Sequence, residues 1–408
     1  MSRTDRQCGQ ILPVVLATLA LAAAAIVLTH RSIRGIGQES AVVNAADAAA
    51  YSGASWTARR LNLIAYTNRS LIASHIAVGH LVATISWLRY TGEAARQIAR
   101  YAQFLPYVGV ATREAQRLVD AAIKTASTAA RGYIVSADRY MDLLSLAQYG
   151  ARNALRPARV DAVMQRVALR YGDDFKVNER RAIEAMPDPY ATAMEARLLS
   201  RQVSAFFKLE GVTPGRDGGY FQRVLRSTIN HDRRLSRWLR GPAQSGGPRF
   251  GRGARDWDRS LFRIVRFRKQ GVTQQPPRTD AGGWRSGDRL QVSFFDWRKM
   301  SWESWSTLAR GDADADRLAG NYVGVARYTR LRQPPRDKSL IRIPALVTAA
   351  LPGRNDREAI NAHISIGEVR YRVPDDCGRH CPSRQDPATL FNPYWEASLS
   401  GLEAPGLP

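Results

Sequence analysis

The sequence predicts an α+β protein in which an N-terminal transmembrane helix continues into an all-α helical region and a mixed C-terminal domain follows. Residues 11–28 form an uncharged apolar run. Apolar residues recur every three or four positions through the N-terminal half, as in helices, whereas short runs after residue 208 alternate apolar and polar residues, as in strands. We expect a short cytoplasmic N-terminus (1–10), a transmembrane helix (11–30), a helical region (31–207) and a C-terminal domain with an antiparallel sheet (208–408).

The apolar run reaches from Ile11 to Leu28, and only Pro13 and Thr18 in it are not plainly apolar. At about 1.5 Å per residue it gives roughly 27 Å of helix, close to the ~30 Å hydrocarbon core of a bilayer. A cleaved signal peptide is the competing interpretation, because residues 22–25 are all Ala and resemble a peptidase site. The apolar run continues beyond these residues, so we favour a retained anchor.

A block of small residues follows the anchor, and residues 44–54 read NAADAAAYSGA. Together with Gly9 and Gln10 before the apolar helix, the segments 58–62 and 65–69, and residues 391–396 near the C-terminus, this block resembles TadG-like proteins of Flp (tight-adherence, type IVc) pilus assembly. The resemblance implies a single-pass protein of the bacterial inner membrane with most of its chain in the periplasm. Its implied partners are the membrane and other pilus-assembly subunits in the envelope.

Gly9 and Gln10 form a candidate leader-cleavage site, because pilin-type leaders are typically cut after a Gly. Such leaders keep a Glu five residues into the mature chain, and the corresponding residue here is Val14. Because Val14 stands where such leaders keep a Glu, an uncleaved anchor is the alternative. Beyond the anchor, Gly35 and Gly37 predict a flexible juncture just outside the membrane, because Gly disfavours a helix.

A heptad-like seam of residues stepping by three and four follows the small-residue block. Its members are Leu61, Ile64, Asn68, Leu71, His75, Val78, Val82 and Ile85. Polar residues on such a seam fix register or oligomeric state, and small residues let helices approach closely. We therefore expect Asn44, Asp47, Asn68 and His75 to take part in helix packing or assembly. The alternative is that Asp47 is a solvated helical residue and His75 an ordinary helix residue.

The remaining elements follow from periodicity and turn signals. Further helices are expected at 110–155, 158–170 and 190–207, and strands at 261–267, 289–297, 322–329, 341–348 and 364–373. In an oxidising periplasm Cys377 and Cys381 would form a local disulfide across a turn. Zinc is the rival, with His380 between them, but a structural site requires four ligands and no second pair with suitable spacing is present in the sequence.

The chain is strongly basic, with a net charge of +24 and a pI near 10.7, and Arg far outnumbers Lys. Arg and Trp gather between residues 233 and 305, which predicts a surface that binds anionic polymers. The candidate residues are Arg237, Trp238, Trp257, Trp284, Arg285, Trp297 and Arg298. Alternatives are Trp residues in the core or at protein interfaces, and a general coding bias toward Arg. A nucleic-acid partner is disfavoured because no nucleic-acid-binding signature occurs.

The sequence contains no nucleophile elbow, phosphate-binding loop, zinc-protease motif or dinucleotide fingerprint. We therefore expect no enzymatic activity, no cofactor and no metal. The function predicted is a membrane-anchored, non-enzymatic component of Tad/Flp pilus assembly that acts through helix packing and a periplasmic domain. The alternative is an anchored adhesin or binding protein for anionic envelope or surface polymers.

Overall fold

The computed structural model describes residues 11–102, 108–179, 209–231, 249–250, 257–261, 263–275, 283–332, 341–350, 360–374 and 388–400. Several predictions lie outside these residues and stay predictions. They are the leader site at Gly9 and Gln10, the Cys377–Cys381 disulfide, the basic pair Arg237 and Trp238, and the helix at 190–207.

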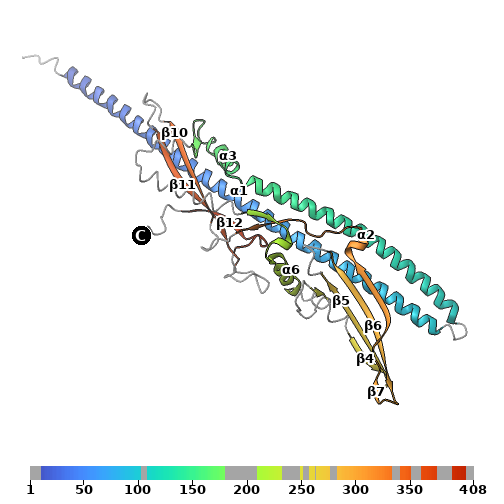
Figure 1. The fold of residues 1–408 in the computed structure, drawn as a ribbon. Coiled ribbons are helices and arrows are strands. Elements are labelled where there is room, and N and C mark those ends of the chain that lie inside the picture. Colours follow the sequence, from blue (N-terminus) through green and yellow to red (C-terminus); the bar gives the residue numbers. More distant parts are fainter. Residues whose placement is uncertain are drawn as a thin grey trace, which may run out of the picture.

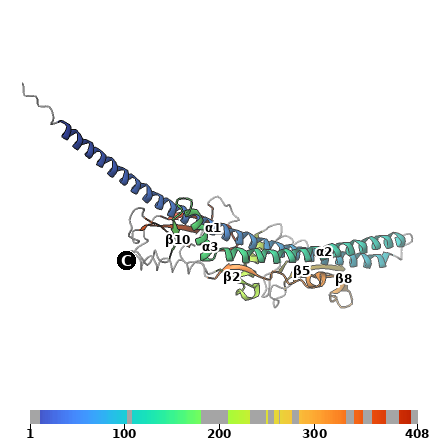
Figure 2. The same cartoon turned by 90° about the horizontal axis from the view of Figure 1, so that it is seen from above.

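A single helix, α1 (Ile11–Ala102), forms the long axis of the molecule (Figures 1 and 2). Its 92 residues extend over roughly 140 Å at about 1.5 Å per residue. The backbone stays helical through Gly35 and Gly37, so the helix is not broken at the juncture expected there. Each Gly disfavours a helix by only about 1 kcal/mol, which the hydrogen bonds on either side outweigh.

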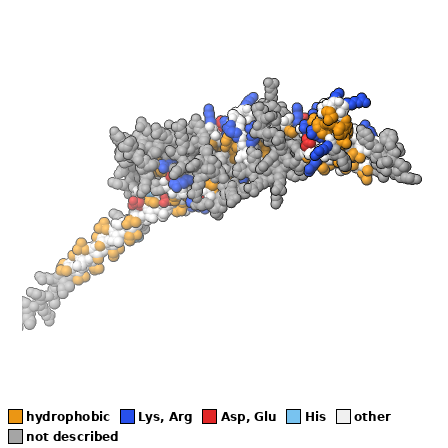
Figure 3. All heavy atoms as spheres, turned by 90° about the horizontal axis from the view of Figure 1, so that it is seen from below, with side chains coloured by type: hydrophobic (Ala, Val, Ile, Leu, Met, Phe, Trp, Pro, Cys, Tyr) orange, Lys and Arg blue, Asp and Glu red, His pale blue; other side chains and the backbone are white. Residues whose placement is uncertain are grey.

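The first part of α1 projects from the body, and the remainder is covered by the rest of the chain (Figures 1 and 3). Residues 12–30 are apolar, long enough to cross a bilayer and unburied, which makes this segment a candidate membrane span. A second apolar stretch, residues 36–100, is also long enough to cross a bilayer, but more than half of its most apolar window is buried inside the protein. The latter stretch is the central helix of the folded body.

Two further helices return along α1. Helix α2 (Val108–Ala154) runs antiparallel to it, since Ser70 contacts Tyr140 and Trp56 Nε1 donates to the Ala154 carbonyl at 3.1 Å. Helix α3 (Pro157–Ala168) starts with Pro at its first position, where the missing N–H has no helical partner to lose. Both helices were predicted to within two residues at each end.

The strands form antiparallel sheets along α1, which confirms the mixed α and β composition expected. The proximal sheet has the order β1-β10-β11-β12, with β1 (Lys176–Val177), β10 (Ile341–Ala350), β11 (Ile360–Tyr371) and β12 (Trp395–Ser400). A two-stranded sheet pairs β2 (Leu209–Val212) with β9 (Tyr328–Leu331). The distal sheet contains β3 (Arg249–Phe250), β4 (Trp257–Leu261), β5 (Val265–Gln274), β6 (Arg285–Asp296), β7 (Ser301–Trp302) and β8 (Ser306–Asp314).

Two strand predictions were wrong in detail. The alternating run at 261–267 is split by a turn at 263–264, where β4 ends and β5 begins. In the run at 322–329, only the last two residues belong to a strand, β9. Strand β8 and helix α6 (Tyr220–His231) were not predicted. The buried face of β8 consists of small residues, which give a weak apolar pattern, whereas α6 has a clear apolar face that was missed.

Helices and strands share their hydrophobic cores. One core joins residues 42–64 of α1 to α3 and to β10 and β11. A second core joins residues 71–85 of α1 to α2 and α6, and includes Trp284 and Tyr328. The boundary expected near residue 208 therefore marks a change from helices to strands but does not separate two independently packed domains.

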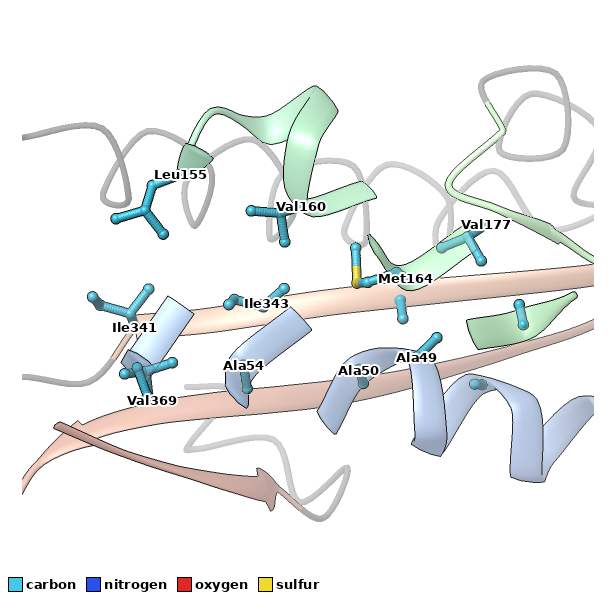
Figure 4. Close-up of a cluster of buried hydrophobic side chains, with 14 of the residues drawn as sticks. Ala49, Ala50, Ala54, Leu155, Val160, Met164, Val177, Ile341, Ile343 and Val369 are labelled. Atoms are coloured by element: carbon cyan, nitrogen blue, oxygen red, sulfur yellow. The ribbon is translucent and has the colours of Figure 1, made fainter. Parts of the chain in front are cut away.

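The small-residue block of α1 packs on the proximal sheet (Figure 4). Ala49, Ala50 and Ala54 are fully buried beside Ile343 and Val369. The backbone approach is so close that a Cβ at Gly367 on β11 would lie 2.2 Å from the Ala50 carbonyl oxygen. The small side chains thus permit a helix to lie directly on a strand of the same chain.

Candidate functional site

The four residues expected to mediate helix packing fall into two groups. Asn44 is exposed and its amide lies 3.5 Å from Ser40 Oγ, and Asp47 is half-buried. Asn68 and His75 are fully buried, as are the apolar members of the seam. The seam is buried as expected and packs on α2 and on loops and strands of the same chain. Asn68 and His75 thus take part in packing within the chain, and a role in assembly with other subunits stays a prediction.

Both the nitrogen and the oxygen of the Asn68 side-chain amide are hydrogen-bonded inside the protein. Its Nδ2 donates to the carbonyls of Thr329 at 2.8 Å and Leu390 at 2.7 Å, and its Oδ1 accepts from Gln148 Nε2 at 2.8 Å. The Gln148 Oε1 in turn accepts from the Thr329 amide at 2.8 Å. This network fixes the register of α1 against α2 and β9.

His75 lies in a buried aromatic cluster with Phe221, Trp284 and Tyr322. Its Nδ1 is 2.9 Å from the Tyr322 hydroxyl, and its Nε2 is 3.1 Å from Gln275 Nε2. Burial lowers the pKa of His75 to about 4, because the buried site disfavours the charged ring. The ring is therefore neutral at pH 7, accepts from Gln275 and donates from Nδ1 to Tyr322.

Two segments far apart in the sequence meet in the fold. Asn62, in the resembling segment of α1, donates from Nδ2 to the Trp395 carbonyl at 2.8 Å and accepts from the Trp395 amide at 3.0 Å. The side chain of Trp395 is itself buried in the proximal core. Two segments separated by 333 positions thus form one local structure.

A buried ion pair holds the distal sheet to α1. Lys269 Nζ on β5 bonds to Asp288 Oδ1 on β6, and both side chains are at most 2% exposed. Ser86 on α1 donates to Asp288 Oδ2 at 2.7 Å and lies 2.9 Å from the Gly311 carbonyl. Lys269 also lies 4.8 Å from the ring centre of Tyr90 on α1, a cation–π contact. Burial and the Asp288 charge raise the pKa of Tyr90, so its hydroxyl stays protonated.

Beyond this ion pair the distal sheet projects away from α1 (Figure 1). Two turns lie side by side at the projecting end, because the Phe295 amide donates to the Ile264 carbonyl at 2.8 Å. One turn joins β4 to β5, and the other, residues 297–300, joins β6 to β7. We name this end the distal tip and define it as residues 257–261, 263–268 and 291–305.

The distal tip exposes large apolar side chains. Trp297 is 63% exposed and Met300 is 71% exposed, and Leu261, Ile264 and Phe294 are exposed as well. Every residue of β4 is exposed. Seen from below, the body carries a cluster of hydrophobic side chains bordered by Lys and Arg toward the end opposite the N-terminal helix (Figure 3). Such a patch on a protein surface marks an interaction site.

Arginine side chains stack on tryptophans across one face of the tip. The Arg266 guanidinium lies 3.8 Å from the ring centre of Trp302, and the Arg268 guanidinium lies 4.2 Å from that of Trp305. The ring of Phe295 contacts both Trp297 and Trp302 edge-on. The stacked Arg groups are held in position and still have N–H groups for an anion.

Two turn residues of the tip adopt a left-handed backbone. Arg263 has φ +55° and Met300 has φ +50°, in a region that Gly occupies without strain. A non-Gly residue there costs on the order of 1–3 kcal/mol. The strain lies at the two turns where the apolar and basic side chains project.

The predicted polyanion-binding residues are only partly gathered at this tip. Trp297 and Arg298 are exposed at its projecting end, whereas Trp257 is exposed at the other end of β4, where it pairs with Lys269. Trp284 was wrongly placed on the surface, because it is fully buried beside His75 and its Nε1 donates to the His75 carbonyl at 2.7 Å. Arg285 is exposed but lies away from the tip, where its guanidinium pairs with Asp314 at 2.8 Å.

Arg266 and Arg268 are functional candidates that sequence reasoning did not single out. Neighbouring Arg–Trp pairs in the sequence suggested the site, whereas the stacking occurs between strands β5 and β7 and the residues beyond β7. The alternating pattern around Arg266 signalled one exposed face. The identity of the facing Trp residues depends on strand register, which the sequence does not specify.

A polar pocket of about 280 Å³ lies at the base of the distal sheet. It is lined by Arg89, Arg285, Arg317, Asp312 and Asp314, among others. Arg285 pairs with Asp314 in this pocket, and Arg89 donates to the Asp312 backbone carbonyl at 2.7 Å. Among the described residues, no group of three His, Cys, Asp or Glu side chains is arranged to hold a metal ion.

Comparison of the chain with protein-family models, with curated proteins and with solved structures found no match.

Proposed function

We propose that this protein is a membrane-anchored, non-enzymatic component of a Tad/Flp-type pilus-assembly system. In this proposal the N-terminal part of α1 crosses the bacterial inner membrane once and the body lies in the periplasm. The body contacts other assembly subunits of the envelope.

The observation that carries the proposal is the continuity of α1. The candidate span at residues 12–30 and the buried core helix at residues 42–85 belong to one uninterrupted helix. A cleaved signal sequence requires no such continuity with the folded body. A permanent anchor benefits from it, because any force or orientation imposed at the membrane is transmitted directly to the body.

The pairing of Asn62 with Trp395 also supports the proposal. The family resemblance rests on two distant stretches, and residues from both form a single pair of hydrogen bonds. The small-residue block between the anchor and Asn62 packs on the same sheet that contains Trp395. The small-residue block and Asn62 therefore both join the helix to the proximal sheet.

Isolation of the protein from native membranes tests the proposal. We expect the full chain to sediment with the membrane fraction and to co-purify, after mild crosslinking, with subunits of a pilus-assembly machine. Mass spectrometry of the mature N-terminus should place it at Met1 or after Gly9, before the apolar run. A soluble monomer that starts within or after residues 22–25 would refute the anchor.

A second candidate function, favoured by the stacked Arg and Trp groups of the distal tip, is binding to an anionic polymer. Binding of this kind weakens steeply with salt, because phosphate or carboxylate groups must exchange counterions for Arg. Titration of the full chain in detergent with polyphosphate and with an acidic polysaccharide, at low and high salt, tests it. Salt-insensitive binding, or none, would exclude this candidate.

A further inference from the structure

We propose that the distal tip inserts into an anionic phospholipid surface. The proposed ligand of the tip is thus a lipid bilayer, and not one of the pilus subunits or soluble polymers considered above. The inference goes beyond the proposed function. One part of it, that this bilayer is a second one, rests on the proposed membrane anchor.

The shape of the tip favours a bilayer. Apolar side chains project from both faces of the sheet and from both turns, since Phe294 and Phe295 alternate on β6 while Ile264 and Trp297 occupy the turns. A protein partner would need a concavity that encloses such a convex end. The interfacial region of a bilayer deforms around inserted apolar and aromatic side chains, and Trp is enriched at that depth.

The charge of the tip selects the kind of lipid. It carries six basic residues, Arg259, Arg263, Arg266, Arg268, Arg298 and Lys299, against three acidic ones, Asp258, Asp296 and Glu303. Two of the acidic groups face basic residues of the tip itself, with Asp258 3.5 Å from Arg268 and Asp296 3.6 Å from Lys299. The remaining positive charge, set just behind the apolar side chains, matches anionic headgroups.

The apolar residues separate a lipid surface from a soluble polyanion. A polymer of phosphate or carboxylate groups would use the Arg side chains and the faces of Trp302 and Trp305. Such a polymer would gain nothing from contact with Met300, Leu261 or Ile264, which are apolar and exposed at a turn or edge strand. Met300 also has a left-handed backbone, which Gly would adopt without strain.

The length of α1 places the tip far from the candidate span. Ser86, which holds the distal sheet, follows His30 by 56 positions, and this corresponds to roughly 84 Å of helix. Since α1 is continuous, the tip stays away from the membrane that holds the first helical turns. It is therefore positioned to contact a second lipid surface.

Vesicle flotation tests the proposal. The full chain is reconstituted in phosphatidylcholine nanodiscs and mixed with vesicles of phosphatidylcholine alone or of phosphatidylcholine with phosphatidylglycerol. We expect flotation with the phosphatidylglycerol vesicles only. The double variant Trp297→Ala/Met300→Ala should reduce the binding constant about tenfold or more, because two apolar side chains no longer leave water. Lys299→Glu should weaken binding as well and reduce its salt sensitivity, because fewer positive charges then pair with anionic headgroups.

Matched variants on the helices serve as controls. Tyr66→Ala removes an aromatic side chain of similar exposure from α1, and Lys124→Glu reverses an exposed charge on α2. Both should bind vesicles as the parent chain does. Circular dichroism of each variant shows whether it is folded. If the double variant does not fold, the proposal is tested by the binding of Lys299→Glu and by the lipid dependence of the parent chain.

Three outcomes would overturn the proposal. They are equal binding to both kinds of vesicle, no binding to either, and binding to polyphosphate that competes with vesicles and is unchanged in Trp297→Ala/Met300→Ala. The last outcome would assign the tip to a soluble polyanion. If the chain does not enter nanodiscs, the proposed membrane anchor is refuted. Flotation of the free chain then still measures binding by the tip.

Discussion

The proximal and distal sheets are attached to the same helix by different means. The proximal sheet lies on the Ala-rich part of α1 through close apolar contact, with Ala50 against Gly367. Its buried carboxylate, Glu368, is held by Arg342 and Arg370 of neighbouring strand positions. The distal sheet also approaches α1 closely, since a Cβ at Gly311 would lie 2.2 Å from the Ser86 carbonyl oxygen. In addition it has a polar attachment, the buried Lys269–Asp288 pair with Ser86 and Tyr90.

The difference separates a stabilising region from an exposed one. In the proximal region nearly every apolar side chain of the helix face is covered, and β10 and β11 are flanked by strands on both sides. In the distal region a polar attachment point fixes the base of the sheet, and its far end carries uncovered Trp, Met and Arg side chains. We infer that the proximal region stabilises the fold, whereas the distal region presents a surface for binding.

The largest expected effect comes from the polar attachment point. Asp288→Ala leaves the Lys269 ammonium buried without its carboxylate, which should lower the free energy of unfolding by about 3–5 kcal/mol. Urea unfolding of the chain in detergent measures the change. The double variant Lys269→Met/Asp288→Leu removes both charges and should recover most of the loss. If the single and double variants are equally unstable, packing matters here more than charge.

The close apolar contact gives the next prediction. Gly367→Ala places a methyl group against the backbone of Ala50, and the forced separation of helix and strand should cost about 1–3 kcal/mol. Gly132→Ala is the matched control, because this exposed Gly in α2 has nothing within 4 Å of the added methyl group. The control should be stabilising by about 1 kcal/mol or less. A tolerated Gly367→Ala would show that the proximal contact can relax.

The buried histidine between the two regions makes stability depend on pH. Because the folded pKa of His75 is lowered to about 4, the unfolded chain takes up a proton below pH 6.5 while the folded chain does not. The contribution of neutral His75 is therefore present above pH 6.5 and is lost as the pH falls toward 4, by up to about 3 kcal/mol. The stability difference between the parent chain and His75→Gln should shrink between pH 7.5 and pH 4.5. A constant difference would refute the lowered pKa.

The smallest effect is expected at the distal tip. Trp297→Ala should change the unfolding free energy by at most about 0.5 kcal/mol, since its side chain is mostly in water. Trp284→Ala is the contrasting variant and should cost about 3–5 kcal/mol, because this Trp is fully buried. Thermal unfolding followed by circular dichroism compares the two. A large loss at Trp297 would mean that the tip stabilises the fold.

Several features were predictable because they depend on local periodicity. The apolar run at 11–28 and the seam from Leu61 to Ile85 identified the exposed and buried parts of α1. The strands near 341–348 and 364–373 followed from their β-rich composition. The turn at 263–264 was missed because the flanking residues alternate as they would in a continuous strand.

The sequence by itself determined that the chain has an apolar N-terminal helix, a long buried helical seam and antiparallel strands. These properties depend on residue spacing, which sets the face of an element that leaves water. Only the tertiary structure decided what covers each face. It assigned the small-residue block and Asn68 to the chain's own strands, buried Trp284 beside His75, and brought Arg266 next to Trp302. Such pairings depend on strand register and on contacts between segments far apart in the chain, which local patterns do not encode.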